Sequence, residues 1–151
     1  YPLWSRGLGD VYKRQTLMSQ FNLIDNRPES LLDDVHEKQV KVLARGPVFK
    51  GLLTSNSNNA LDKKFADGIF DYTNDELGET VASIKEIESN LTALSFNYLT
   101  SHDALGSIIV GASSVEQLEE NVKNYYKDVS LDQIKAARER VKDLQYTQHL
   151  K

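Results

Sequence analysis

Residues 105–121 read LGSIIVGASSVEQLEEN, and this stretch decides the fold class. The apolar run from Leu105 to Val110 predicts a buried strand that ends at a glycine. Ser113 and Glu116 have the spacing of a capping box, which opens a helix. The inward stripe of that helix is predicted to be Val115, Leu118, Val122 and Tyr125. A buried strand that leads directly into a helix is typical of an α/β protein with a parallel sheet.

Two apolar runs upstream predict further strands. They are TLMSQFNLI at residues 16–24 and VKVLA at residues 40–44. A helix should lie between them, because Asn26 is a candidate cap ahead of Pro28 and Glu29. Three strands leave two sheet edges without a neighbour, so the count fits part of a larger sheet.

The rest of the chain reads as one long connection and several helices. Residues 48–72, which contain SNSNN, have a weak pattern and predict a long irregular connection. Helix starts are predicted at a Thr73–Glu76 capping box, at Asn90, and at a Ser130–Gln133 capping box. The last helix should bury the stripe Leu131, Ile134, Ala137, Val141 and Leu144.

Composition narrows the classes of function. The chain has 151 residues, a formal charge of −4 and no cysteine, so disulfides and thiolate sites are excluded. The acidic balance disfavours nucleic acid as a partner, and no apolar run approaches the ~20 residues of a membrane helix. His36, His102 and His149 share no metal-ligand spacing, so we expect surface histidines and no metal site. A cytoplasmic location is expected.

Residues 1–15 differ from all that follows. They lack apolar periodicity and an initiator methionine, and they fit neither a signal peptide nor a mitochondrial presequence. SRGLGDVYKRQ at residues 5–15 resembles, codon for codon, the translation of a sequencing-library adaptor. We therefore interpret residues 1–15 as a non-native, adaptor-derived, disordered leader, and residues 16–151 as part of a domain from a metagenomic fragment. The gene would then extend upstream of Thr16.

Three stretches together resemble the C-terminal part of the aldo/keto reductase family. They are QFNLIDNRPESLL (20–32), VKVLARGPVFKGLLT (40–54) and SIIVGASSVEQLEENV (107–122), and the resemblance covers essentially all of residues 16–145. It implies a (β/α)8 TIM barrel, of which this chain would hold about strands 6–8. Those strands would be Thr16–Leu23, Val40–Ala44 and Leu105–Val110. Because a whole barrel takes about 250 residues, the upstream half would be missing.

The resemblance also implies a cofactor, NADPH with NADH possible, and a small-molecule carbonyl substrate for the complete parent. Arg45 would stack on the nicotinamide ring. The pyrophosphate would lie along the turn at Gly46, Val48 and Lys50. The adenosine end would meet Gly111, Ser113, Gln117, Glu120 and Asn121.

Two positions depart from the family pattern. Residues 111–117 contain no basic residue, although many NADPH-preferring members carry one there for the 2′-phosphate. Met18 falls where many members have a glutamine that faces the nicotinamide amide. The preference for NADPH over NADH therefore stays open.

The family's catalytic aspartate, tyrosine, lysine and histidine lie on the first four strands. The resemblance therefore implies no catalytic residue in this chain and no activity for the fragment alone. Two alternatives remain: a non-catalytic cofactor-sensing or regulatory barrel subunit, and a small interaction domain whose strand edges are covered by self-association. The oligomeric state is left open.

Overall fold

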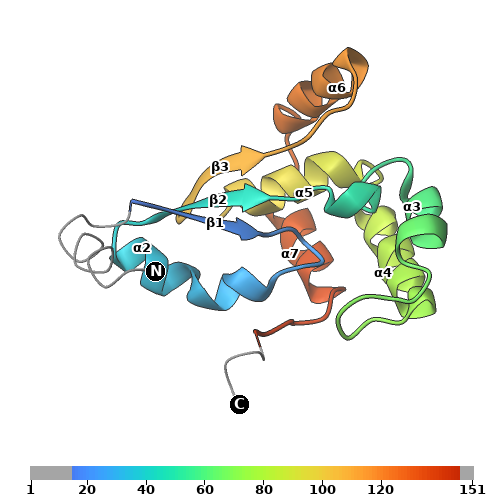
Figure 1. The fold of residues 1–151 in the computed structure, drawn as a ribbon, viewed down its shortest axis with the longest axis horizontal. Helices are drawn as coiled ribbons and strands as arrows, with labels where there is room; N and C mark the ends of the chain where they lie inside the picture. The colour runs from blue at the N-terminus through green and yellow to red at the C-terminus, as the bar shows by residue number, and fades with distance from the viewer. Residues whose placement is uncertain (1–14, 147–151) are drawn as a thin grey trace, which may run out of the picture.

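Three short strands form one parallel sheet in the order β1-β2-β3 (Figure 1). The computed structural model describes residues 15–146, so all but the last residue of the predicted leader lies outside the described range. The strands are β1 (Thr16–Gln20), β2 (Lys41–Arg45) and β3 (Leu105–Ile109). The parallel α/β prediction is confirmed, with strand ends that shift by one to three residues.

Helices occupy the connections. They are η1 (Arg27–Leu31), α2 (Leu32–Glu37), η2 (Phe49–Gly51), α3 (Ser57–Lys64), α4 (Asn74–Ile87), α5 (Leu91–Thr100), α6 (Val115–Tyr125) and α7 (Leu131–Glu139). The strand arrowheads in Figure 1 point toward α3 and α4, which therefore lie beyond the carboxyl ends of the strands. The prediction of an irregular connection over residues 48–72 is wrong in part, since this segment contains α3.

Within residues 15–146, helices cover one face of the sheet and leave the other open. On β2, Val42 and Ala44 are buried, whereas Lys41 and Arg45 on the opposite face are exposed. Register pairs Gln20 with Arg45, so both side chains belong to the open face. This arrangement fits a section of a β/α barrel, in which helices cover the outer face of the sheet and the open face points into the barrel.

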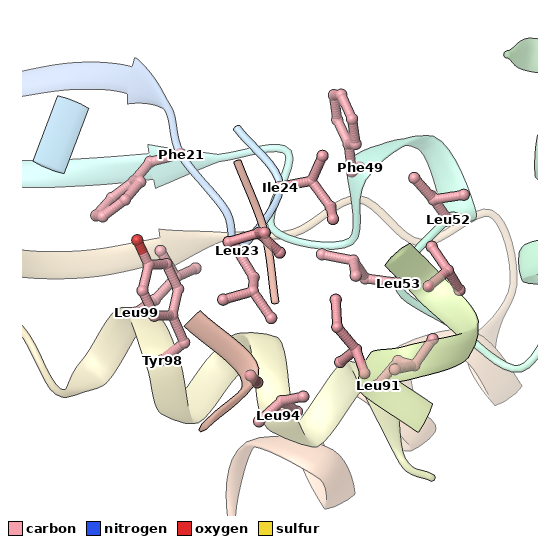
Figure 2. Packing of buried hydrophobic residues seen from close by; sticks show 14 of the residues in the cluster. Phe21, Leu23, Ile24, Phe49, Leu52, Leu53, Leu91, Leu94, Tyr98 and Leu99 are labelled. Carbon is pink, nitrogen blue, oxygen red and sulfur yellow. The ribbon is translucent and has the colours of Figure 1, made fainter. Parts of the chain in front are cut away.

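The prediction that the first strand continues to Leu23 is wrong, because β1 ends at Gln20 and the segment after it enters the core. Residues 21–26 are all buried. The side-chain oxygen of Asn22 accepts hydrogen bonds from the backbone N–H groups of Ile24 (3.0 Å) and Asp25 (2.8 Å), which folds the chain into a tight turn. Figure 2 shows the resulting cluster, which joins this segment to the turn after β2 and to α5. Its labelled members are Phe21, Leu23, Ile24, Phe49, Leu52, Leu53, Leu91, Leu94, Tyr98 and Leu99.

Two of the predicted helix starts are capping boxes in the structure, at Thr73–Glu76 and at Ser130–Gln133. The predicted cap at Asn90 is also confirmed. Ser113 and Glu116 do not form the third box, because Ser114 is the cap of α6 and accepts from the N–H of Gln117.

Asn26 is the N-cap residue of η1, as predicted, but its side chain makes no cap hydrogen bond. Its amide nitrogen donates to the backbone oxygen of Lys142 (2.9 Å), and its amide oxygen accepts from the N–H of Leu144 (2.9 Å). The predicted cap instead holds the C-terminal segment against the start of η1.

The predicted inward stripe of α6 is exposed. Leu118 is 52% exposed and Val122 is 51% exposed. On its other side α6 contacts α5, and the buried Asn124 side chain accepts a hydrogen bond from the Asn90 amide (2.8 Å). On α7, Leu131 is likewise exposed, whereas Ile134 and Ala137 are buried as predicted. Val141 and Leu144 are buried too, but they lie beyond the end of α7 at Glu139. The exposed apolar face of α6 lies beside the edge of β3. In a closed β/α barrel a neighbouring strand and helix would cover this edge.

Candidate functional site

A groove of about 670 Å³ lies beyond the carboxyl ends of β2 and β3. The segment after β2 and one residue each from α3 and α5 form its first wall: Val48, Lys50, Gly51, Thr54, Ser55, Asn56, Lys64 and Thr92. The loop after β3 and one face of α6 form its second wall: Gly111, Ala112, Ser113, Gln117, Glu120, Asn121 and Asn124.

The groove brings together most of the residues predicted from two distant motifs. Val48 and Lys50 come from the first motif, and Gly111, Ser113, Gln117, Glu120 and Asn121 from the second. Arg45 and Gly46 do not line the groove. Arg45 lies on the open face of the sheet, and the backbone oxygen of Gly46 accepts from the side chain of Asn22 at 2.9 Å.

The first wall is built on an unusual backbone turn. Phe49 (φ 46°), Lys50 (φ 55°) and Gly51 (φ 93°) all have left-handed conformations, which non-glycine residues rarely adopt. Phe49 is 1% exposed, and its ring centroid lies 5.0 Å from that of Phe65. Burial of the Phe49 side chain therefore holds the strained turn in place, as is common at functional sites.

Hydroxyl groups of α5 fix the two sides of this turn. The Ser95 hydroxyl donates to the backbone oxygen of Pro47 (2.6 Å), and the Thr92 hydroxyl donates to that of Leu53 (3.0 Å). Both hydroxyl-bearing side chains are buried. The wall is thus attached to the most buried helix, which makes it a preformed surface.

The second wall begins just before α6, where the donors of Ser113 are already engaged. The backbone N–H and the hydroxyl of Ser113 both lie 2.9 Å from the side-chain oxygen of Gln117. The pKa of Glu116 is lowered, because its carboxylate accepts from its own backbone N–H and from Ser114. The first turn of α6 therefore stabilises negative charge, as helix starts do.

Gly111 has no structural reason to be glycine. A Cβ added there would meet nothing within 4 Å, and its φ is not positive. By contrast, Gly68 has a φ of +74° and would place a Cβ 2.2 Å from a backbone oxygen. Open space in front of Gly111 leaves its backbone accessible to a ligand in the groove.

Several lining residues were missed by sequence reasoning. Lys64 lies at the end of a helix that the weak pattern of residues 48–72 did not predict. Thr54 accepts from the N–H of Asn56 at 3.1 Å and donates to the oxygen of Gly51 at 2.6 Å, which shapes the wall. The SNSNN run was the available signal, since such residues favour turns and helix starts.

A second polar cluster lies at the end of β1. Asp25 is 0% exposed and accepts from Arg27 at 2.7 and 2.9 Å and from the Gln20 amide at 2.9 Å. Gln20 shares its sheet face with Met18, the position where many family members have a glutamine. The chain therefore places an amide on this face two residues after the aligned position.

The histidines divide between surface and interior. His36 is exposed as predicted, and His149 lies outside the described residues. His102 lies in the turn after α5 and is partly buried, so the surface prediction holds only in part. His102 packs against Phe21 and Tyr98, with ring centroids 5.3 and 4.9 Å away. Within residues 15–146 no group of His, Asp and Glu side chains could hold a metal ion, and no helix is long and apolar enough to span a membrane.

Comparison with known proteins shows the family to which the chain belongs. The sequence model of the Aldo/keto reductase family matches residues 10–141. The chain belongs to the aldo/keto reductase family. The matched range starts inside the predicted leader and covers all three strands.

Relatives of the chain are about twice its length. It is 36% identical over 138 residues to an uncharacterized oxidoreductase, YqkF, of Bacillus subtilis, a match that covers 89% of the chain and 45% of the relative. The holo form of the aldo-keto reductase AKR11C1 from Bacillus halodurans superposes with a TM-score of 0.80 at 25% identity, covering 98% of the chain and 50% of that structure.

A more distant structure supports the fold alone. The thermostable aldo-keto reductase Tm1743, solved with the inhibitor epalrestat, gives a TM-score of 0.58 at 20% identity. That match covers 83% of the chain and 39% of Tm1743. The chain thus spans about half the length of the aldo/keto reductases it resembles.

Proposed function

We propose that this chain is the nucleotide-binding C-terminal part of an NAD(P)H-dependent aldo/keto reductase barrel. The carrying observation is that Lys50 and Ser113, predicted from separate motifs, line one groove. Ligands of parallel α/β sheets bind beyond the carboxyl ends of the strands, where this groove lies. The complete enzyme would reduce aldehydes or ketones, or oxidise the corresponding alcohols.

The residues present fit a dinucleotide. The groove offers positive charge at Lys50 and polar side chains at Glu120 and Asn121 for an adenine or ribose. The accessible backbone at Gly111 allows close approach of a phosphate. On the open sheet face, Arg45 would present its flat guanidinium to the nicotinamide.

Bound NAD(P)H supplies the hydride that reduces the carbonyl. The residues of this chain bind and orient the cofactor. Proton transfer to the substrate belongs to the tyrosine expected on the upstream strands, so residues 16–151 alone should bind nucleotide without turnover. On this proposal residues 1–15 are no part of the enzyme.

The test is a titration of NADPH, followed by its fluorescence, against the chain and two glycine variants. Gly111→Val should weaken binding by about tenfold or more, because the side chain fills the space in front of the loop. Gly78→Ala on α4 is the matched control, since its Cβ would meet only a leucine methyl at 3.8 Å, an ordinary contact. Equal affinity of the Gly111 variant and the control would refute the assignment of the groove.

A further inference from the structure

We propose that Lys64 of α3 is an additional phosphate-binding residue of this groove. The inference rests on the proposed function, because it concerns the phosphates of the same dinucleotide. Lys64 was not predicted from the sequence, and it reaches the groove from the wall opposite Gly111 and Ser113.

The position of the Lys64 ammonium is fixed by the strained turn. Its Nζ donates to the backbone oxygen of Lys50 at 2.8 Å. Lys50 has a φ of 55°, so the left-handed turn is what presents this oxygen to α3. An ammonium group has three donors, and this bond uses one of them. The others can bind a phosphate without release of the turn.

The positive charge in the groove comes from the first wall. Among the described lining residues, the bases are Lys50 and Lys64 and the acid is Glu120. The loop from Gly111 to Gln117 contributes no base, and the donors of Ser113 already face the Gln117 side chain. Neutralisation of a phosphate therefore falls to the lysines of the first wall.

Two phosphate groups of the cofactor are candidates for Lys64. Its bond to Lys50 places it near the turn expected to follow the pyrophosphate, which both NADH and NADPH carry. The missing base on the last loop leaves the 2′-phosphate, which only NADPH carries, in need of a cation. Both are phosphate oxygens bound by an ammonium, and the two cofactors distinguish them.

The experiment compares Lys64→Gln with Lys63→Gln. Glutamine at position 64 removes the charge and keeps a donor for the Lys50 oxygen, so the turn stays supported. Lys63 is exposed on the same helix turn and does not line the groove, so its variant carries the same charge change. Affinities for NADPH and NADH are measured by fluorescence, and thermal melts verify that both variants fold.

The Lys64 variant should lose about tenfold in affinity, and the Lys63 variant should stay within about twofold of the wild-type chain. Equal losses for NADH and NADPH assign Lys64 to the pyrophosphate, and a loss confined to NADPH assigns it to the 2′-phosphate. If the wild-type chain binds the cofactor and the two variants have the same affinity, the Lys64 proposal is overturned and the proposed function stands. If the wild-type chain binds neither cofactor, the proposed function fails and the Lys64 proposal with it.

Discussion

Replacing Arg27 by methionine should destabilise the chain by about 3 kcal/mol. The reason is Asp25, whose carboxylate is completely buried at the end of β1. Arg27 holds both carboxylate oxygens, with Nε 2.7 Å from Oδ1 and Nη2 2.9 Å from Oδ2. The hydrogen bond to Asp25 raises the pKa of Arg27, so the guanidinium keeps its positive charge at this site. Methionine leaves a buried carboxylate without its cation.

The magnitude follows from the surroundings of the pair. Removal of one partner of a buried ion pair costs roughly 3–5 kcal/mol. The lower end applies because Arg27 is 23% exposed and because the Gln20 amide still donates to Asp25 at 2.9 Å. The guanidinium also lies 4.3 Å from the ring centroid of Phe70 and 5.0 Å from that of Tyr146, and methionine retains only the apolar part of these contacts.

The assay is urea unfolding followed by far-UV circular dichroism. With a slope of about 1.5 kcal/mol/M, a loss of 3 kcal/mol lowers the midpoint by about 2 M. Arg140→Met is the matched control, because Arg140 is exposed at the end of α7 and forms no ion pair with any residue in 15–146. Its change should stay within about 0.5 kcal/mol.

A double variant separates the unpaired charge from lost packing. If the cost comes from the carboxylate, Asp25→Asn should recover stability in the Arg27→Met background, because the amide carries no charge. A loss below about 1 kcal/mol for Arg27→Met, or no recovery in the double variant, would refute the reasoning.

Three further changes test other features. Gly68→Ala should lower the free energy of unfolding in urea by at least about 2 kcal/mol, because Gly68 has a φ of +74° and the added Cβ would lie 2.2 Å from the backbone oxygen of Tyr72. Gly111→Ala should change it by no more than about 0.5 kcal/mol. Similar values for the two variants would contradict the geometry. Burial lowers the pKa of His102 in the folded state, so its contribution to stability is complete above the unfolded value of about 6.5 and is lost as the pH falls below it. His102→Phe should therefore reduce the fall in melting temperature between about pH 7 and pH 5, and the exposed His36→Phe should not. If the apolar face of α6 causes the chain to self-associate, the wild-type chain should form oligomers in sedimentation velocity and Leu118→Lys should reduce them without lowering the melting temperature, because Leu118 is 52% exposed. A monomeric wild-type chain or an unchanged distribution would argue against this role of the face.

The local signals for the helix starts at Thr73, Asn90 and Ser130 were read correctly, whereas the cap of α6 lies one residue later than predicted. The capping boxes at Thr73 and Ser130 each join a side chain to a backbone group three residues away, so the pattern contains the whole interaction. The strands of the sheet were equally visible as short apolar runs between turn signals. The prediction that they are buried is wrong for β1 and β3, most of whose residues are exposed. The groove was predicted in outline by two motifs, each of which follows one of these strands.

Tertiary structure decided the features that depend on distant partners. Asn26 has a helix-cap pattern, yet its amide binds backbone groups 116 and 118 residues away. The apolar stripe of α6 is real in the sequence, but burial requires a neighbour, and none of the described residues covers it. Lys64 joins the groove only because α3 folds back over the turn at Lys50. By itself the sequence determined the strands and most of the helices, which follow from periodicity and local hydrogen bonding, and its motifs determined the family. Only the tertiary structure decided which charges share the groove, because that depends on how the connections pack.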